Sequence, residues 1–544
     1  MFTKSPVNGM MNLGSDYRYL TYKEDFPVNE KALTNEHVAY NRAKIWQIIL
    51  FTLNNTSTNI YLFAFSFVTY FSTGILGLAA IFVSQLMGYI RVFDGVIDPA
   101  IGILIDKTDT KFGKYRPILV MGNIVTALSF ILLFNINHFG EGMKIPLFLI
   151  ALIIHKIGYS LQQTITKAGQ AALTNDPQQR PVFNIFDGIF TTILFSGGQM
   201  IVSGYLVPKY KGFTPEFFKV FVFGVIVISA LLGICALIGI WQKDNKKYFG
   251  LGEKTQKTSL KDYWAVIKGN QPLKVLALSA AMVKFVAQLF SDSVVTVMLF
   301  GILLGNYALS GQISLIMIIP GVAITVGVSS IARRKGLRFA YILALQVGIV
   351  AATLLAGLLF VSKPGALNLG KWDLYTVTFL VLYAFARYAS TAPSSLVLTM
   401  GADITDYETS VSGRYLSGMI GTIFSLTDSI ASSFAPMVVG WVLASIGFAS
   451  AYPTVETELT SSLKMTTIIL FAIIPIIALL ISLFLMRFYK LDRETMVQIQ
   501  EKIHVMKAAK DVERVQDIAK NVPLSDMDYV DLSQYPLEED EQDK

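Results

Sequence analysis

The chain has 544 residues, of which 53% are hydrophobic and only 15% are charged, whereas soluble domains use roughly a quarter of their residues as charges to cover a surface facing water. The apolar residues run in long blocks, which favours an integral membrane protein. A single cysteine excludes a disulfide framework, and the net charge of +7 is typical of cytoplasmic loops in membrane proteins, so no nucleic-acid partner is expected.

The first 45 residues are polar and mixed in charge, lack the features of a cleavable signal peptide, and are expected to form a cytoplasmic segment. After them come twelve apolar stretches that reach the ~20 residues required to cross the hydrocarbon core as a helix. They lie near residues 46–72, 76–105, 117–137, 146–173, 183–207, 217–241, 272–302, 308–332, 339–361, 373–400, 413–446 and 465–488. An all-α membrane protein with twelve transmembrane helices is therefore predicted.

Basic loops indicate the orientation of these helices and divide them into two sets of six. The loop DKTDTKFGKYR after the second predicted helix and the loop ARRKGLR after the eighth hold equivalent places in the two sets. The linker 242–271 carries seven lysines against three acids, so it and both termini are expected in the cytoplasm. This symmetry predicts an N-terminal bundle (46–241) and a C-terminal bundle (272–488), as in two-bundle secondary transporters.

Residues 489–544 form a polar tail that is expected in the cytoplasm. Asp492 can cap a helix in which Met496, Ile499, Ile503 and Met506 recur at helical spacing, which predicts an amphipathic helix. The last 22 residues hold eight acids and one lysine, a composition that predicts disorder.

Charged residues inside the predicted helices are candidate functional residues, because a charge at membrane depth costs on the order of 3 kcal/mol or more. In the second predicted helix, Arg91, Asp94 and Asp98 are spaced so that they share one face. Asp94 and Asp98 could ligate Na⁺ or share a proton. The alternative is an Arg91–Asp94 ion pair that only joins helices.

Polar residues elsewhere predict a polar cavity between the two bundles. Asn54, Asn55, Thr58 and Asn59 in the first helix are unusual for a lipid-facing surface and are expected to line that cavity. The seventh predicted helix carries a polar residue at every fourth position, which predicts a polar stripe along one face, formed by Lys284, Gln288 and Asp292.

Some of these charges are expected to neutralise one another. Lys167 could pair with Asp187, and Arg387 could pair with Asp428 or Asp292. Tyr159 is a candidate for stacking on a sugar ring. No HExxH motif, phosphate-binding glycine loop or nucleophile–base arrangement occurs, so no enzyme activity, cofactor or resident metal is expected beyond a transported ion.

Two stretches carry a family resemblance, namely RVFDGVIDPAIGILIDKTDTKFGKYRP (91–117) and GADITDYETSVSGRYLSGMIG (401–421). They resemble motifs of the glycoside–pentoside–hexuronide:cation symporter family. This family includes the melibiose permeases and belongs to the major facilitator superfamily. The opening of the seventh helix and the tail sequence YKLDRETMVQI also fit. The resemblance spans roughly residues 45–500. It implies two six-helix bundles, alternating access and uptake of a sugar or glycoside with Na⁺, H⁺ or Li⁺, in a bacterial inner membrane. The protein is expected to act as a monomer.

The resemblance, together with the polar and aromatic residues of the predicted cavity, gives a set of expected site residues. The expected cation site comprises Asp94, Asp98, Gln163 and Asp428. The expected substrate contacts are Thr58, Asn59, Tyr159, Gln163, Lys167, Asp187 and Arg387. The loop residues expected to take part in gating are Asp106, Lys114 and Arg116.

Several of these positions depart from the pattern of melibiose-type members. Thr58 and Gln163 replace acids, Lys167 replaces an aromatic residue, Asp187 replaces an arginine and Asp428 replaces a lysine. The substrate therefore stays open, including a hexuronide whose carboxylate Lys167 would bind, and so does the choice between Na⁺ and H⁺. A symporter of an organic anion or amphiphile, or a transporter-like sensor, are the alternative functions.

Overall fold

The computed structural model describes residues 41–108, 110–174, 176, 179–245, 267–413, 417–503 and 505–506. The predicted N-terminal segment, most of the linker and the acidic tail therefore lie outside the described residues. The helix that carries Asp94, Asp98 and Asp106 is described, but the side chains of these three residues are not.

Helices make up most of the described chain, and short breaks or single π-helical turns interrupt several of them. The first half contains α2 (Ile45–Phe65), α3 (Val68–Gly74), α4 (Ala80–Lys107), α5 (Arg116–Leu133), α6 (Glu141–Leu173), α7 (Arg180–Ile201), α8 (Val207–Tyr210) and α9 (Pro215–Ile240). The second half contains α11 (Gln271–Phe290), α12 (Ser293–Thr296), α13 (Ala308–Ile316), α14 (Ile318–Lys335), α15 (Leu337–Val361), α16 (Leu374–Ala384), α17 (Pro393–Ser412), α18 (Ser417–Ala444), α19 (Ser461–Ile468) and α20 (Ile474–Leu485). Joined across the breaks, the described helices follow the twelve predicted stretches in order.

Within the described residues, eight helices are long and apolar enough by themselves to cross a membrane. A further pair, Ser293–Leu303 and Ala308–Ile316, meets at an angle of 110°. This bend falls at the predicted boundary between the seventh and eighth helices, where Gly305 has a φ of +73° that favours glycine.

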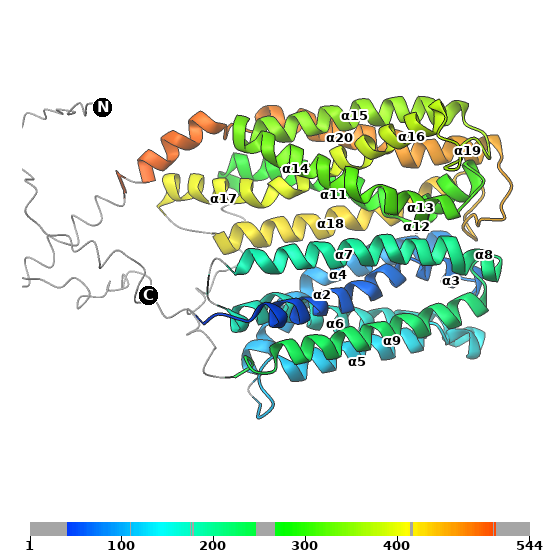
Figure 1. Ribbon diagram of the computed structural model, residues 1–544, viewed down its shortest axis with the longest axis horizontal. Coiled ribbons are helices and arrows are strands. Elements are labelled where there is room, and N and C mark those ends of the chain that lie inside the picture. Colours follow the sequence, from blue (N-terminus) through cyan, green and yellow to red (C-terminus); the bar gives the residue numbers. More distant parts are fainter. Residues whose placement is uncertain are drawn as a thin grey trace, which may run out of the picture.

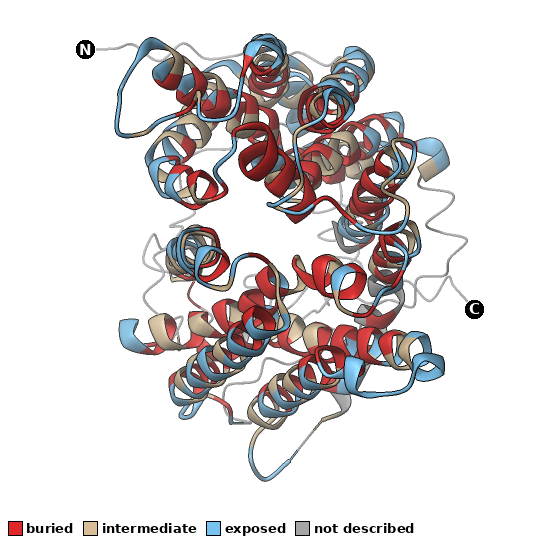
Figure 2. Cartoon of the chain, turned by 90° about the vertical axis from the view of Figure 1, so that its right-hand side faces the viewer, coloured by how far each residue is buried: buried red, intermediate tan, exposed pale blue. Residues whose placement is uncertain are grey.

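The two halves lie side by side with their helices along the long axis of the molecule (Figure 1). The start of α2 and a helix over residues 493–503, called the tail helix, lie at one end, here named the terminal end. Across the boundary between the halves, α4 packs against α18 and α7 packs against α13. Figure 2 looks onto the other end, named the opposite end, and shows many exposed positions on the outside of both halves. The exposed residues of the two halves include large apolar side chains such as Phe223 and Leu354, as expected for a surface that faces lipid.

The halves touch each other at the opposite end. The backbone N–H groups of Ala80 and Ile81 donate to the carbonyl oxygens of Ser450 and Ala449, at 3.1 and 3.2 Å. The amide of Gln199 donates to the Ser310 hydroxyl at 2.9 Å. Backbone and side-chain contacts therefore close this end of the molecule.

Glycines bring the helices of the two halves into close contact. A Cβ atom at Gly311 of α13 would lie 2.6 Å from the Cα of Met200, and one at Gly88 of α4 would lie 2.7 Å from the carbonyl oxygen of Ser433. Real Cβ atoms do not approach other atoms so closely. Small residues at such crossings allow membrane helices to pack backbone against backbone.

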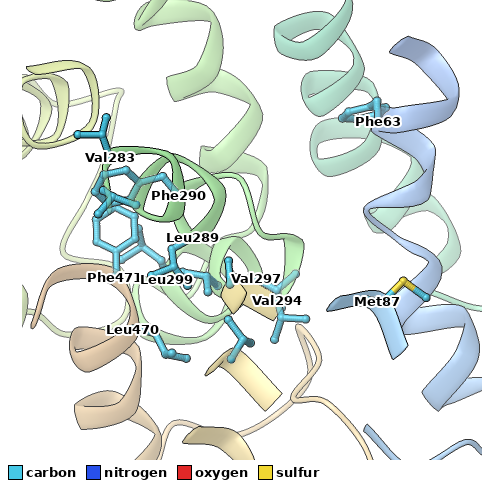
Figure 3. Packing of buried hydrophobic residues seen from close by; sticks show 14 of the residues in the cluster. Phe63, Met87, Val283, Leu289, Phe290, Val294, Val297, Leu299, Leu470 and Phe471 are labelled. Atoms are coloured by element: carbon cyan, nitrogen blue, oxygen red, sulfur yellow. The ribbon is translucent and has the colours of Figure 1, made fainter. Parts of the chain in front are cut away.

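A large cluster of buried apolar residues extends through the second half of the molecule (Figure 3). Phe290 at the end of α11 packs against Phe471 with ring centroids 5.1 Å apart. Val283 and Leu289 belong to the same buried cluster. This packing holds the end of α11 in place, and α11 carries Lys284 of the site described below.

Candidate functional site

Four polar side chains from three helices of the first half form a connected group, here called the N-half polar cluster. Asn55 of α2 donates to the Asp187 carboxylate of α7 at 2.6 Å, and Gln163 of α6 donates to the Asn55 side-chain oxygen at 3.2 Å. The Gln163 amide also lies 3.3 Å from the Tyr159 hydroxyl, one turn earlier on α6. The four members are only partly buried, so the cluster offers donors and acceptors to a polar ligand.

Thr58 and Asn59, two of the expected substrate contacts, lie elsewhere. Thr58 is fully buried, and its hydroxyl oxygen lies 2.9 Å from the Asn54 carbonyl oxygen and 2.8 Å from the Gln162 side-chain oxygen, which share its single proton. Asn59 is 8% exposed. The structure therefore uses Thr58 in the packing of α2 on α6. Asn55 is the partly exposed member of the four polar residues in this helix.

The expected ion pair between Lys167 and Asp187 is wrong: no such pair occurs between these two described residues, and Asp187 is bound by Asn55 instead. Lys167 lies one turn beyond Gln163 on α6 and its side chain is exposed. Because two helices contribute to any such pair, its formation depends on how they are rotated about their axes, which spacing along one chain does not specify.

The charges of the second half pair differently from expectation. Asp428 of α18 forms an ion pair with Lys284 of α11, with 2.9 Å between Nζ and Oδ2. Arg387 donates to the carbonyl oxygen of Phe290 at 2.6 Å and does not pair with Asp428. Asp292 accepts from the backbone N–H groups at the start of α12, because α11 ends at Phe290. The predicted polar stripe therefore ends at Gln288.

The Lys284–Asp428 pair lines a cavity of about 820 Å³ between α11, α17 and α18. Seven of its twenty lining residues are alanine or glycine, and its other polar lining residues include Gln288, Ser291, Ser394, Thr405, Asp406, Ser425 and Thr427. Asp406 accepts a hydrogen bond from Gln500 of the tail helix at 2.7 Å, so the cavity reaches the terminal end. Leu398, which also lines it, is 86% exposed.

The expected cation ligands fall into different parts of the structure. Asp94 and Asp98 belong to α4, with side chains outside the described residues. Arg91 of the same helix donates to the Ser432 carbonyl of α18 at 3.2 Å and so joins the two halves. Gln163 belongs to the N-half polar cluster and Asp428 to the cavity of the second half. Among the described residues, no three His, Cys, Asp or Glu side chains gather as a metal-binding group.

The loop with the expected gating residues is tied to the end of α9 by Asp244, which the sequence analysis missed. The buried Asp244 carboxylate accepts from the backbone N–H groups of Lys114, Tyr115 and Arg116, at 2.9, 3.1 and 2.8 Å. The Arg116 guanidinium also lies 4.6 Å from the centre of the Trp241 ring. The position of the acidic Asp244 in a lysine-rich linker was the only feature of the sequence that could have indicated this role. Its partners could not be predicted, because they are backbone N–H groups of another segment.

The chain matches the family described as MFS/sugar transport protein over residues 52–493. YagG of Escherichia coli (strain K12), a protein described by name as a glycoside/cation symporter, is 25% identical over 471 residues, which cover 86% of this chain and 92% of YagG. The isoprimeverose transporter of Lactiplantibacillus pentosus is 23% identical and covers 79% of this chain and 85% of its own length.

Among solved structures, the nucleoside transporter NupG has a TM-score of 0.56 at 13% identity, covering 81% of this chain and 99% of NupG. Identity this low shows a common fold and nothing more. The prediction of an all-α membrane fold with twelve helices is confirmed.

Proposed function

Because the chain belongs to the MFS/sugar transport protein family, we propose that it carries a sugar or glycoside across a membrane by symport with a cation. The observation that carries the proposal is the N-half polar cluster, in which two amides, a phenol and a carboxylate lie within hydrogen-bond reach of one another. A sugar presents hydroxyl groups that both donate and accept, and such a mixed cluster can bind them. Tyr159 adds a ring on which a pyranose can stack. Membership of a transporter family also speaks against an enzyme.

Transport proceeds by rocking of the two halves about the site between them. The present conformation is closed at the opposite end by the Gln199–Ser310 and Ala80–Ser450 contacts, and its cavity reaches the terminal end. The basic loops favour a cytoplasmic location for the terminal end, and the same side is proposed for both termini. This is the state that faces the cytoplasm, in a multi-pass protein of a bacterial inner membrane that acts as a monomer.

The coupling cation is Na⁺ or H⁺ and is cargo rather than a resident metal. Asp94 and Asp98 on α4 are the proposed ligands in the first half, since two carboxylates one helical turn apart supply hard oxygen atoms. Gln163 and Asp428 remain the further proposed cation residues. Arg387 and Lys167 remain proposed substrate contacts.

An organic anion as the solute is the second candidate function. It is favoured by Lys167, which is exposed, lies one turn from Gln163 and forms no ion pair with the neighbouring Asp187. An exposed lysine beside an amide is suited to bind a carboxylate.

The proposal is tested by counterflow of radiolabelled lactose, isoprimeverose and methyl β-D-glucuronide in proteoliposomes, with and without Na⁺ at two pH values. Asn55→Ala and Gln163→Ala should each raise the half-saturation concentration of the transported sugar about five- to tenfold, the value of one or two neutral hydrogen bonds. Gln312→Ala, at an exposed amide of α13, is the matched control and should leave transport unchanged. Exchange of none of these sugars by folded protein would refute sugar symport.

A further inference from the structure

Lys284 and Asp428 form an ion pair about halfway along two membrane-spanning helices. The distance between Nζ and Oδ2 is 2.9 Å, and the two side chains are 40% and 48% exposed. Both therefore reach into the cavity between α11, α17 and α18, which opens towards the terminal end. An ion pair this open to solvent contributes little to folding, because water screens the attraction and competes for both charges.

The surroundings of the pair leave room for a ligand. Small residues such as Ala281 and Gly421 are part of the cavity lining, and at Gly421 no atom lies within 4 Å of where a Cβ would be. The cavity volume of about 820 Å³ lies within the range of small-molecule sites. The space next to the pair can therefore take a sugar ring.

Of the described residues that line this cavity, Lys284 is the single cation. The other charged lining residue besides Asp428 is Asp406, whose carboxylate is bound by Gln500 of the tail helix. From α4, which packs on α18, Arg91 reaches the Ser432 carbonyl one turn beyond Asp428. Among the described lining residues, Lys284 and Asp428 thus neutralise each other.

We propose that this pair is an exchange site for an acidic solute and its coupling cation: the carboxylate of the solute replaces Asp428 at Lys284, and the cation replaces Lys284 at Asp428. The inference rests on the proposed symport function and names its substrate class, a glycoside that bears a carboxylate. It places the acid-binding residue in the second half of the molecule, apart from the N-half polar cluster.

The net charge of the site in each ligand state explains why transport of the solute is coupled to transport of the cation. The empty site is neutral, because the two side chains pair with each other. With both ligands bound it is neutral again, since the solute charge faces Lys284 and the cation faces Asp428. With one ligand alone, either Asp428 or Lys284 loses its counter-charge. Closing the cavity then removes water from an unpaired charge at membrane depth, which is strongly unfavourable. The half-loaded carrier is therefore the one that cannot reorient.

The test compares methyl β-D-glucuronide with methyl β-D-glucoside, which differ by a carboxylate in place of a hydroxymethyl group. Equilibrium exchange and gradient-driven accumulation are measured in proteoliposomes with Na⁺ and with proton gradients. The wild-type protein should prefer the glucuronide at least tenfold. Lys284→Ala should remove that preference by weakening glucuronide binding tenfold or more while changing glucoside binding less than twofold, and Lys284→Arg should restore it.

Two further variants separate this role from a structural one. Asp428→Asn should keep glucuronide exchange but lose its cation dependence and its accumulation, because Lys284 no longer has a competing carboxylate. Lys274→Ala, at an exposed lysine near the start of the same helix, should behave as the wild type. In the wild type, cation and glucuronide should each raise the affinity for the other by the same factor.

The outcomes distinguish this inference from the proposed function. Transport of the glucoside with equal or greater preference, or a Lys284→Ala protein that keeps the preference for glucuronide, would overturn the exchange site and leave sugar symport intact. If folded wild-type protein carries neither of these two probes and neither lactose nor isoprimeverose, both proposals are refuted.

Discussion

Replacing Asp244 with alanine should release the loop between α4 and α5 from the end of α9. The Asp244 side chain is fully buried, and its carboxylate accepts three backbone N–H groups, from Lys114, Tyr115 and Arg116, in addition to the Arg116 side chain at 3.3 Å. These donors lie at the start of α5, where a helix has no carbonyl partners of its own for its first N–H groups. The negative charge also lies favourably at this helix terminus.

The size of the effect follows from the number of donors that lose their acceptor. A buried donor left without a partner costs about 1–3 kcal/mol, so three donors give an upper range of about 3–9 kcal/mol. Lys114 and Arg116 are only partly buried, and water can replace part of the lost bonding. We therefore expect the lower end, about 3 kcal/mol, which corresponds to a change of about 10²-fold in the equilibrium for local opening.

Hydrogen–deuterium exchange of detergent-purified protein measures this opening directly. The amides of residues 114–116 should exchange about 10²-fold faster in Asp244→Ala than in the wild type, while amides in α9 and the second half stay protected. Asp373→Ala is the control, because Asp373 also caps a helix, α16, through the Thr376 N–H, but at the other end of the molecule. A rise of less than about threefold in folded Asp244→Ala protein would show that the carboxylate does not hold the loop.

Three more outcomes are expected. Gly311→Val should force α13 away from Met200 and open the opposite end, and this opening should speed maleimide labelling of Ser293→Cys in a Cys235→Ser background. Gly327→Val, at a glycine with open space around it, should leave the labelling rate unchanged. Equal labelling rates in the two valine variants would contradict the close-packing argument. Ile503→Asp should detach the tail helix, because this isoleucine is buried, and speed proteolysis around residues 490–506, whereas the exposed Val497→Asp should not. The Asp492 carboxylate accepts hydrogen bonds from the backbone N–H and the hydroxyl of Thr495, and these bonds hold the pKa of Asp492 below the ordinary value of 3.8. The capping contribution of Asp492 is present above pH 3.8 and is lost as the pH falls through the lowered pKa, so amide protection in the tail helix should be lower at pH 3 than at pH 6. A decrease of the same size in Asp492→Asn would contradict this explanation.

The number, order and approximate limits of the helices could be predicted from the sequence. A helix that crosses the hydrocarbon core requires a run of about 20 apolar residues, and such a run can be recognised from consecutive residues of one segment. The tail helix could be predicted as well, because Ile499 and Ile503 recur at helical spacing and both are buried against the second half. Each of these features depends on neighbours within one stretch of chain.

The partners of the polar side chains were decided by the tertiary structure. Lys284 pairs with Asp428, Asn55 rather than Thr58 joins the N-half polar cluster, and Asp244 binds three backbone groups that no side-chain pattern marks. Each outcome depends on the rotation and depth of one helix against another. Backbone contacts at glycines such as Gly311 and breaks such as the end of α11 at Phe290 set these quantities. Hydropathy along the chain determines which segments enter the membrane, whereas the close packing of separate segments determines which of their charges meet.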